Sequence, residues 1–555
     1  MVFITKLGKK FLMSILGMDV DDPEVRKYLF KMDSLTLITL DAVVKDVIEK
    51  NKNPKKAEDI KTSKIDLAWK KTGENFDDWK KVAVKQLTKY VTPDLSIKIL
   101  GEDDLLGEYT CTDSLIGKGM RSTTLFPMKD PIVYFDSEED AAAFMKETEL
   151  AQGMANPLSY NEQVFDMVSD ASFSRIFFFG IGCPLVQDAT STSAELGPFV
   201  VDMPLQDLQV RKGFMKYGAR IHFNSAQEVT GIFDYTKNKL VTPKDDEKEW
   251  EEAKFLSKIS CFTLVTAREH LVWSHLLLSN TATREKTLCL PPSHPIRRLL
   301  TIFTFGSTEV NQNAFDALVP ETCLLHRALG LKYSSMQAVF DSAFKESIVY
   351  EPYADRKVDP GLKKLSDEGK FPYISEGVAY FEIVRTFVKK WMAKAGDACK
   401  DEHALEFYNA MRKASKGQKY EIPEHSDENM ANLCAQIIFT VTAFHELVGA
   451  VTDYVGVLPN RAGFRSCRGK TEVDIQSFII ASCIGASTSV RMPVLMSKFE
   501  NFFGVGGAPE WEREHWEAFR SDLAKQSQAV KAADAKREVE FKYFDPARFE
   551  CSISV

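Results

Sequence analysis

The pattern of apolar and polar positions predicts a mostly helical fold built around two long buried helices. The first begins with the acidic run PKDDEKEWEEAK and is expected to extend from about Asp246 to Asn280, since acidic side chains favour a helix N-terminus. Its middle, FLSKISCFTLVTA, is apolar on more than one face. The second is expected from roughly Met430 to Val455 and contains ANLCAQIIFTVTAFHELVGAV, which is apolar almost all round. Helices of this kind pass through a protein interior.

The rest of the chain shows weaker patterns. Residues 1–60 are charged and have a helical pattern, whereas residues 100–135 carry Gly, Pro and Thr and favour irregular structure or short strands. Residues 195–242 contain the alternating segment GARIHFNSAQEVTGIFDYT, which predicts a small pair of strands. The expected fold class is therefore mainly α, with long buried central helices and a few short strands.

Both predicted buried helices carry histidines. His270 and His275 are five residues apart in REHLVWSHLLL, and His445 lies in IIFTVTAFHELVG. On a regular α-helix, positions five apart diverge by about 140°. A π-bulge would bring the two imidazoles to one side, and such bulges cluster at functional sites. As an isolated motif, this spacing is more often that of ordinary helix histidines.

These three histidines and the chain end Ser-Ile-Ser-Val555 form a candidate metal site. Three imidazoles and the terminal carboxylate of Val555 would offer nitrogen and oxygen donors without a thiolate. Such a set suits iron, manganese or zinc and leaves coordination positions open. If it forms, the chain is a redox metalloenzyme.

Composition narrows the functional classes. The chain has 555 residues and 44% hydrophobic content, which is enough for a large core. A net charge of -8 without a basic block gives no indication of a nucleic-acid partner. The 10 cysteines include no CxxC pair, which favours free thiols in a reducing, cytoplasmic compartment. The longest apolar stretches, such as RIFFFGIGCPLV, are expected to be too short for a membrane span.

The first 17 residues need separate consideration. Ile4, Leu7, Phe11 and Ile15 share one helical face, with lysines elsewhere. A basic amphipathic helix of this kind can lie on a membrane surface or dock on the body of the protein. Residues 1–17 are therefore the candidate for peripheral membrane contact, and their broken apolar region is a poor signal peptide.

Further segments follow the first two histidines in a fixed order. They are HPIRRLL at 294–300, TEVNQNAFDALV at 308–319, FPYISEGVAYFEIVRTFVKKW at 371–391, LPNR at 458–461 and the terminal SISV. From about Met167 to Val555 this order resembles the lipoxygenase family. The resemblance implies one large lipoxygenase-type helical domain over residues 61–555 and an N-terminal helical extension over residues 1–60. The β-sandwich module that precedes this domain in many members is not apparent.

The resemblance implies a non-haem iron site, with manganese as an alternative. His270, His275 and His445 would supply imidazoles, and Val555 would supply its main-chain carboxylate. Many members have Asn, His or Ser four residues after the third histidine, and this sequence has Gly449 there. The coordination number is therefore expected to differ from the usual pattern.

The implied reaction is dioxygenation of a polyunsaturated fatty acid that contains a cis,cis-1,4-pentadiene. Metal-bound hydroxide would abstract hydrogen, and O2 would add to give a hydroperoxide. By resemblance, Ala314 would favour S products, Leu318 would clamp the reacting carbon and Arg461 would meet the substrate carboxylate. The plainer interpretations are a small packing residue, a core leucine and a surface arginine. His294 is expected to make structural hydrogen bonds.

Two alternatives remain open at this point. The missing fourth side-chain ligand favours a hydroperoxide isomerase or lyase on the same fold. A metal-free lipid-binding or scaffold protein on a decayed enzyme fold is the other alternative.

Overall fold

The computed structural model describes residues 168–189, 194–211, 213–304, 324–451, 463–466, 495–503 and 509–553, with isolated positions between and before them such as 310–311 and 318–319. The predicted extension at residues 1–60, the candidate membrane helix and the predicted irregular region at 100–135 lie outside the described residues. The division of the chain at residue 60 stays a prediction.

An antiparallel sheet and a short helix open the described part of the chain. Helix α9 (Asp170–Phe178) precedes strands β1 (Val186–Asp188), β2 (Phe199–Met203), β3 (Ala219–Phe223), β4 (Val229–Asp234) and β5 (Lys239–Val241). The strands pair in sequence order, β1-β2-β3-β4-β5. The predicted strand pair is thus part of a five-stranded meander. The sequence pattern did not reveal the flanking strands β1 and β5, because each is too short to show alternation.

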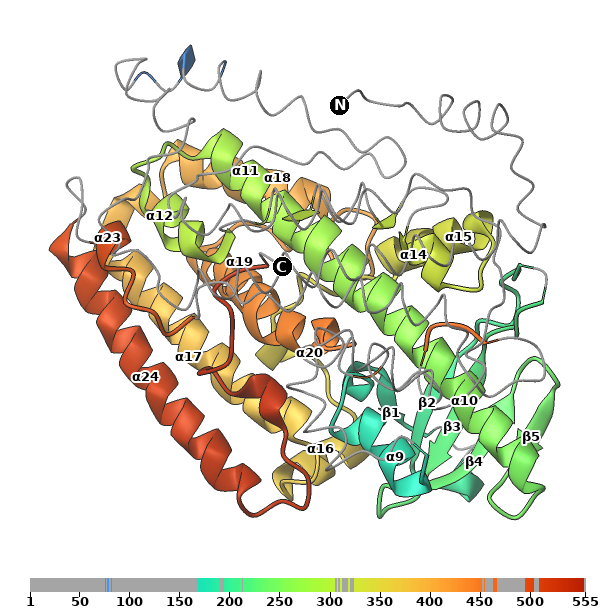
Figure 1. Ribbon diagram of the computed structural model, residues 1–555. Coiled ribbons are helices and arrows are strands. Elements are labelled where there is room, and N and C mark those ends of the chain that lie inside the picture. The colour runs from blue at the N-terminus through green and yellow to red at the C-terminus, as the bar shows by residue number, and fades with distance from the viewer. Residues whose placement is uncertain are drawn as a thin grey trace, which may run out of the picture.

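The long first helix is continuous through three segments. They are α10 (Glu247–Leu264), the π-helix η5 (Val265–Ser279) and α11 (Asn280–Cys289). Asp246 caps the start by accepting from the Glu249 amide at 3.1 Å, as the acidic run predicts. The helix crosses the whole molecule diagonally in Figure 1. It ends at Cys289 and not at Asn280, because residues 281–289 continue helical backbone bonding.

The second buried helix is also composite. It contains α19 (Asp427–Phe439), the π-helix η9 (Thr440–Phe444) and α20 (His445–Gly449). Its span Asp427–Gly449 is long and apolar enough to cross a membrane by length and composition, contrary to the expectation from the sequence. However, 83% of its most apolar window is buried inside the protein, as in the core helix of a globular fold. It ends at Gly449, short of the predicted Val455.

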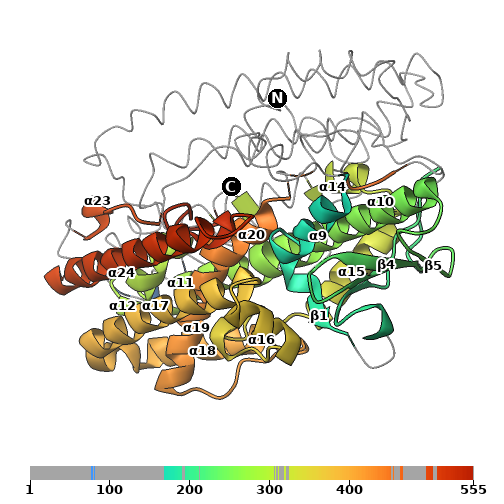
Figure 2. The ribbon, with the colours of Figure 1, turned by 90° about the horizontal axis from the view of Figure 1, so that it is seen from below.

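The other helices surround these two. They are α12 (Pro295–Thr301), α14 (Leu324–Ala328), α15 (Tyr333–Lys345), α16 (Pro360–Asp367), α17 (Pro372–Ala395), α18 (Glu402–Ala414), α23 (Glu500–Phe503) and α24 (Glu510–Asp534). Short 3-10 turns are η3 (Cys183–Leu185), η4 (Ala194–Leu196), η6 (Ile302–Thr304), η7 (Tyr353–Asp355), η8 (Gly396–Cys399) and η10 (Lys542–Phe544). Helix α17 packs against both α19 and α24, and α17 and α24 run side by side in Figures 1 and 2.

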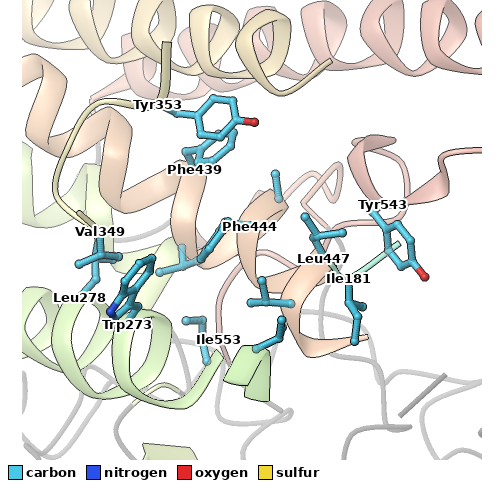
Figure 3. Close-up of a cluster of buried hydrophobic side chains, with 14 of the residues drawn as sticks. Ile181, Trp273, Leu278, Val349, Tyr353, Phe439, Phe444, Leu447, Tyr543 and Ile553 are labelled. Atoms are coloured by element: carbon cyan, nitrogen blue, oxygen red, sulfur yellow. The ribbon is translucent and has the colours of Figure 1, made fainter. Parts of the chain in front are cut away.

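The core lies where the two composite helices meet the C-terminal segment. Figure 3 shows Trp273, Phe444, Leu447 and Ile553 in one buried cluster; each of these side chains is at most 7% exposed. Six cysteines of the described part are buried and free, in line with the expectation of free thiols (Cys183, Cys261, Cys289, Cys399, Cys434 and Cys551). The mainly α class predicted from the sequence is confirmed.

Candidate metal centre

Three imidazoles from the two composite helices meet in the interior. His270 and His275 lie on η5, and His445 begins α20 directly after η9. The Nε2 atom of His270 lies 3.0 Å from that of His445 and 3.1 Å from that of His275. The Nε2 atoms of His445 and His275 are also 3.1 Å apart. The three nitrogens therefore form a nearly equilateral triangle.

The local widening predicted from the histidine spacing is present. The π-helix η5 extends over 15 residues, and the amide of Asn280 donates to the carbonyl of His275, five residues earlier. Ser274 Oγ likewise donates to the carbonyl of Glu269 at 2.8 Å. Bonding over five residues places positions i and i+5 on one face, so His270 and His275 point to the same place.

Burial keeps the imidazoles of η5 neutral. It lowers the pKa of His270 well below its ordinary value, and the adjacent His275 ring lowers it further. Burial likewise lowers the pKa of His275 to about 4, although the hydrogen bond to Asn311 opposes this shift. Near pH 7 both rings are neutral, and a neutral imidazole keeps one nitrogen lone pair free to bind a metal ion.

Asn311 is a neighbour of His275 that the sequence did not reveal. His275 Nδ1 and Asn311 Oδ1 lie 2.9 Å apart, and Asn311 Nδ2 donates to the His275 carbonyl at 3.3 Å. Metal-binding histidines commonly make such a bond from the second ring nitrogen to an acceptor. In the sequence, Asn311 is marked only by its position within TEVNQNAFDALV, one of the segments that carry the family resemblance.

The donor set fits a metal ion. Adjacent nitrogen ligands at bond lengths of about 2.1 Å lie about 3.0 Å apart in an octahedral arrangement, which matches the observed Nε2 separations. In the part of the chain that the structure describes, these histidines form a cluster with metal-ligand spacing, and their donor atoms all lie within 4.8 Å of one another. Imidazole ligands suit iron, and a face of three leaves positions for oxygen donors.

Gly449 lies directly beside this cluster. A Cβ atom built there would come within 3.3 Å of His270 Nε2 and 3.7 Å of His445 Cε1. A side chain at this position would therefore point at the space between the imidazoles. Since glycine has none, the site lacks the fourth side-chain donor whose absence the sequence indicated.

An ion pair beside the cluster holds the start of η5. Glu269 is 1% exposed, and Arg268 Nε donates to its Oε1 atom at 2.8 Å. Burial raises the pKa of Glu269, while Arg268 lowers it. The Arg268 guanidinium also lies 5.3 Å from the Trp273 ring centre, and Trp273 Nε1 donates to the Ala343 carbonyl at 2.7 Å. These contacts join η5 to α15 and restrict the rotation of η5 about its own axis.

The remaining predicted site residues are partly described. Leu318 is half-buried and packs against the core. Ala314, Arg461 and Val555 lie outside the described residues, so their roles stay predictions. His294 accepts from the Ile296 amide at 3.1 Å and caps α12, which agrees with the expected structural role.

Comparison with known proteins gives distant relatives of one kind. No protein family model matches the chain. The chain is 23% identical to polyunsaturated fatty acid lipoxygenase ALOX15 of Oryctolagus cuniculus over 346 residues, 57% of this chain and 50% of the relative. It is 22% identical to the Homo sapiens protein of the same name over 339 residues, 57% and 50% of the two chains. The chain thus spans about half the length of the curated relatives it matches.

Solved structures identify the fold. A calcium-dependent 11R-lipoxygenase gives a TM-score of 0.67 at 15% identity, over 88% of this chain and 81% of that chain. A lipoxygenase from Fusarium graminearum gives 0.63 at 14% identity, over 81% and 90%. A lipoxygenase crystallised with arachidonate gives 0.63 at 17% identity, over 86% and 81%. The sequence resemblance is therefore confirmed, and the chain has the mainly helical lipoxygenase fold.

Proposed function

We propose that this chain, which has the lipoxygenase fold, dioxygenates polyunsaturated fatty acids to hydroperoxides with a redox-active metal, iron or manganese. The observation that carries the proposal is the triangle of imidazole nitrogens from His270, His275 and His445. Its nitrogen spacing and its two π-helical supports are those of a built site, whereas ordinary core histidines would each find a separate hydrogen-bond partner. The relatives' names add the substrate class, and one related structure contains arachidonate.

The terminal carboxylate of Val555 is the proposed oxygen ligand. Ile553, two residues earlier, is fully buried in the core cluster with Trp273 and Phe444. Two further residues extend at most about 7 Å. The proposal is that the chain end, which starts from this interior position, presents its carboxylate to the imidazoles.

The apolar surroundings support radical chemistry. Once bound, the metal would supply the one-electron chemistry that removes hydrogen from a bis-allylic carbon. The residues of the chain hold the substrate methylene in place and exclude water and competing reactions. Leu271 follows His270 directly along the chain and Leu447 lies two residues after His445, and both side chains are buried in the apolar core. In this proposal Ala314 and Leu318 contact the acyl chain, and Arg461 binds its carboxylate.

Metal content and product formation test the proposal. Protein produced with added iron should contain a stoichiometric amount of iron or manganese and convert linoleic acid to a conjugated diene, measured by ultraviolet absorbance. His445→Ala should lose both properties. His222→Ala is the control, because His222 is a buried histidine that lies in strand β3 and does not belong to the cluster. If the parent protein bound no metal, the dioxygenase proposal would fail, and a lipid-binding protein on this fold would remain as the explanation.

Gly449 favours one alternative reaction. The absent side-chain donor leaves room for a substrate hydroperoxide beside the imidazoles, so hydroperoxide isomerisation or cleavage is the second candidate function. Incubation with linoleic acid and, separately, with its hydroperoxide distinguishes the two. A dioxygenase would increase the diene absorbance when incubated with the fatty acid. An isomerase or lyase would decrease the diene absorbance when incubated with the hydroperoxide.

A further inference from the structure

Asn311 contacts both the ring and the backbone of His275. Its side-chain oxygen lies 2.9 Å from His275 Nδ1, and its amide nitrogen donates to the His275 carbonyl at 3.3 Å. The residue is fully buried and lies 36 positions further along the chain. A buried amide must find partners for both of its ends, and Asn311 finds them on this one histidine.

The backbone contact determines which ring nitrogen carries the proton. A carbonyl oxygen can only accept a hydrogen bond, so the Asn311 amide nitrogen must face the His275 carbonyl. The Asn311 oxygen then faces Nδ1, which must donate to it. The proton of the neutral ring therefore lies on Nδ1, and the lone pair lies on Nε2. A flipped amide would place two acceptor oxygens against each other.

The same carbonyl is part of the π-helix. His275 O accepts from the Asn280 amide, five residues later, as well as from Asn311. Asn311 therefore supports the widened helical turn and the ring orientation together. Both effects direct the His275 Nε2 lone pair toward the other two imidazoles.

We propose that Asn311 is a positioning residue that fixes His275 in the Nδ1-protonated tautomer and thereby sets the metal affinity of the three-histidine cluster. The inference rests on the metal centre of the proposed function, but it does not require that the metal carry out dioxygenation. It assigns to Asn311 an action through His275, without contact with metal or substrate.

Zinc affinity tests this role without catalysis. Zinc is redox-inactive and accepts the same imidazole donors, and its affinity for metal-depleted protein can be measured by competition with a chromophoric chelator. Asn311→Leu should weaken zinc binding about 10–100-fold, the usual cost of removing such an outer partner. Asn311→Asp keeps an acceptor for Nδ1 and should bind within about tenfold of the parent.

The matched control is Ser274→Ala. Ser274 is fully buried, and its hydroxyl bonds to the Glu269 carbonyl within the same π-helix. If Asn311 only stabilised the helix, Ser274→Ala would weaken zinc binding as much as Asn311→Leu. That result, or unchanged affinity in Asn311→Leu, would overturn the proposal. Weaker zinc binding in Asn311→Leu than in both Asn311→Asp and Ser274→Ala would support it.

Activity of the iron-loaded parent separates the two proposals. Zinc affinity that depends on Asn311, together with no diene formation by the iron-loaded parent, would refute the dioxygenase and leave the positioning role intact. Diene formation with zinc affinity independent of Asn311 would refute the positioning role alone. A parent protein that binds no zinc would refute the metal centre and both proposals with it.

Discussion

At the residue scale, the site is defined by what surrounds each imidazole. Burial keeps His270 and His275 neutral near pH 7, Asn311 orients His275, and Gly449 leaves space beside His270. When the Nε2 atoms that face each other at 3.0–3.1 Å all carry lone pairs, they repel each other, and a bound metal ion removes that repulsion. The cluster is therefore arranged for a cation.

Substitution of Gly449 tests that space. Gly449→Asn should add an oxygen donor and slow metal loss to a chelator by about tenfold, equal to ~1.4 kcal/mol. Both variants place a Cβ atom about 3.3 Å from His270 Nε2. Gly449→Leu, which is of similar size but brings no oxygen donor to offset this crowding, should accelerate metal loss. Dissociation is followed by the absorbance of the chelator complex. Equal rates for the two variants would contradict a donor effect at this position.

At the element scale, two π-helices bring the ligand positions together and α17 supports the second. Tyr380 on α17 and Thr442 on η9 are buried, and their hydroxyl oxygens lie 2.7 Å apart. Thr442 donates its proton to the Ile438 carbonyl at 2.6 Å, so Tyr380 must donate to Thr442. This bond attaches the π-turn that precedes His445 to the neighbouring helix.

Removal of the Tyr380 hydroxyl should cost stability. Tyr380→Phe is expected to lower the free energy of unfolding by ~1 kcal/mol, the typical net value of a buried hydrogen bond. The measurement is the midpoint of urea unfolding. Tyr420→Phe, a half-buried tyrosine of the connection before α19, is the control and should change the free energy by less than about 0.5 kcal/mol. An equal effect in both variants would argue against a specific link to η9.

At the scale of the whole molecule, α17 also holds the segment that leads to the chain end. Glu376 on α17 lies 2.6 Å from Arg537, which in turn lies 2.7 Å from Asp534 at the end of α24. Burial raises the pKa of Glu376 to about 7, while Arg537 acts in the opposite direction and Asp534 and Asp545 raise it further. The segment that leads to the buried residue Ile553 therefore begins beside a carboxyl group whose pKa is close to neutrality.

The raised pKa predicts a pH-dependent stability. Between pH 4.5, the ordinary pKa of this carboxyl, and about pH 7, native Glu376 holds a proton that the unfolded chain releases. Stability from this group therefore falls as pH rises through that window. Glu376→Gln, which cannot ionise, should gain stability relative to the parent as pH rises, measured by urea unfolding at about pH 5 and about pH 8.

The control for this prediction is Glu382→Gln on the same helix. The side chain of Glu382 is 46% exposed and pairs with Arg385, so the free energy of unfolding of Glu382→Gln should differ little from that of the parent at both pH values. If Glu376→Gln and the parent gave parallel stability profiles, Glu376 would not be the group that titrates.

The sequence alone determined the features that depend on local periodicity. Two apolar segments predicted two buried helices, an acidic run marked the start of the first at Asp246, and the spacing of His270 and His275 required a π-type widening. Only the tertiary structure decided the features that join distant positions. These include the pairing of Asn311 with His275, the ion pair between Glu376 and Arg537 and the five-strand order of the sheet. Such contacts depend on how packed elements meet in space, which no pattern within a single segment encodes.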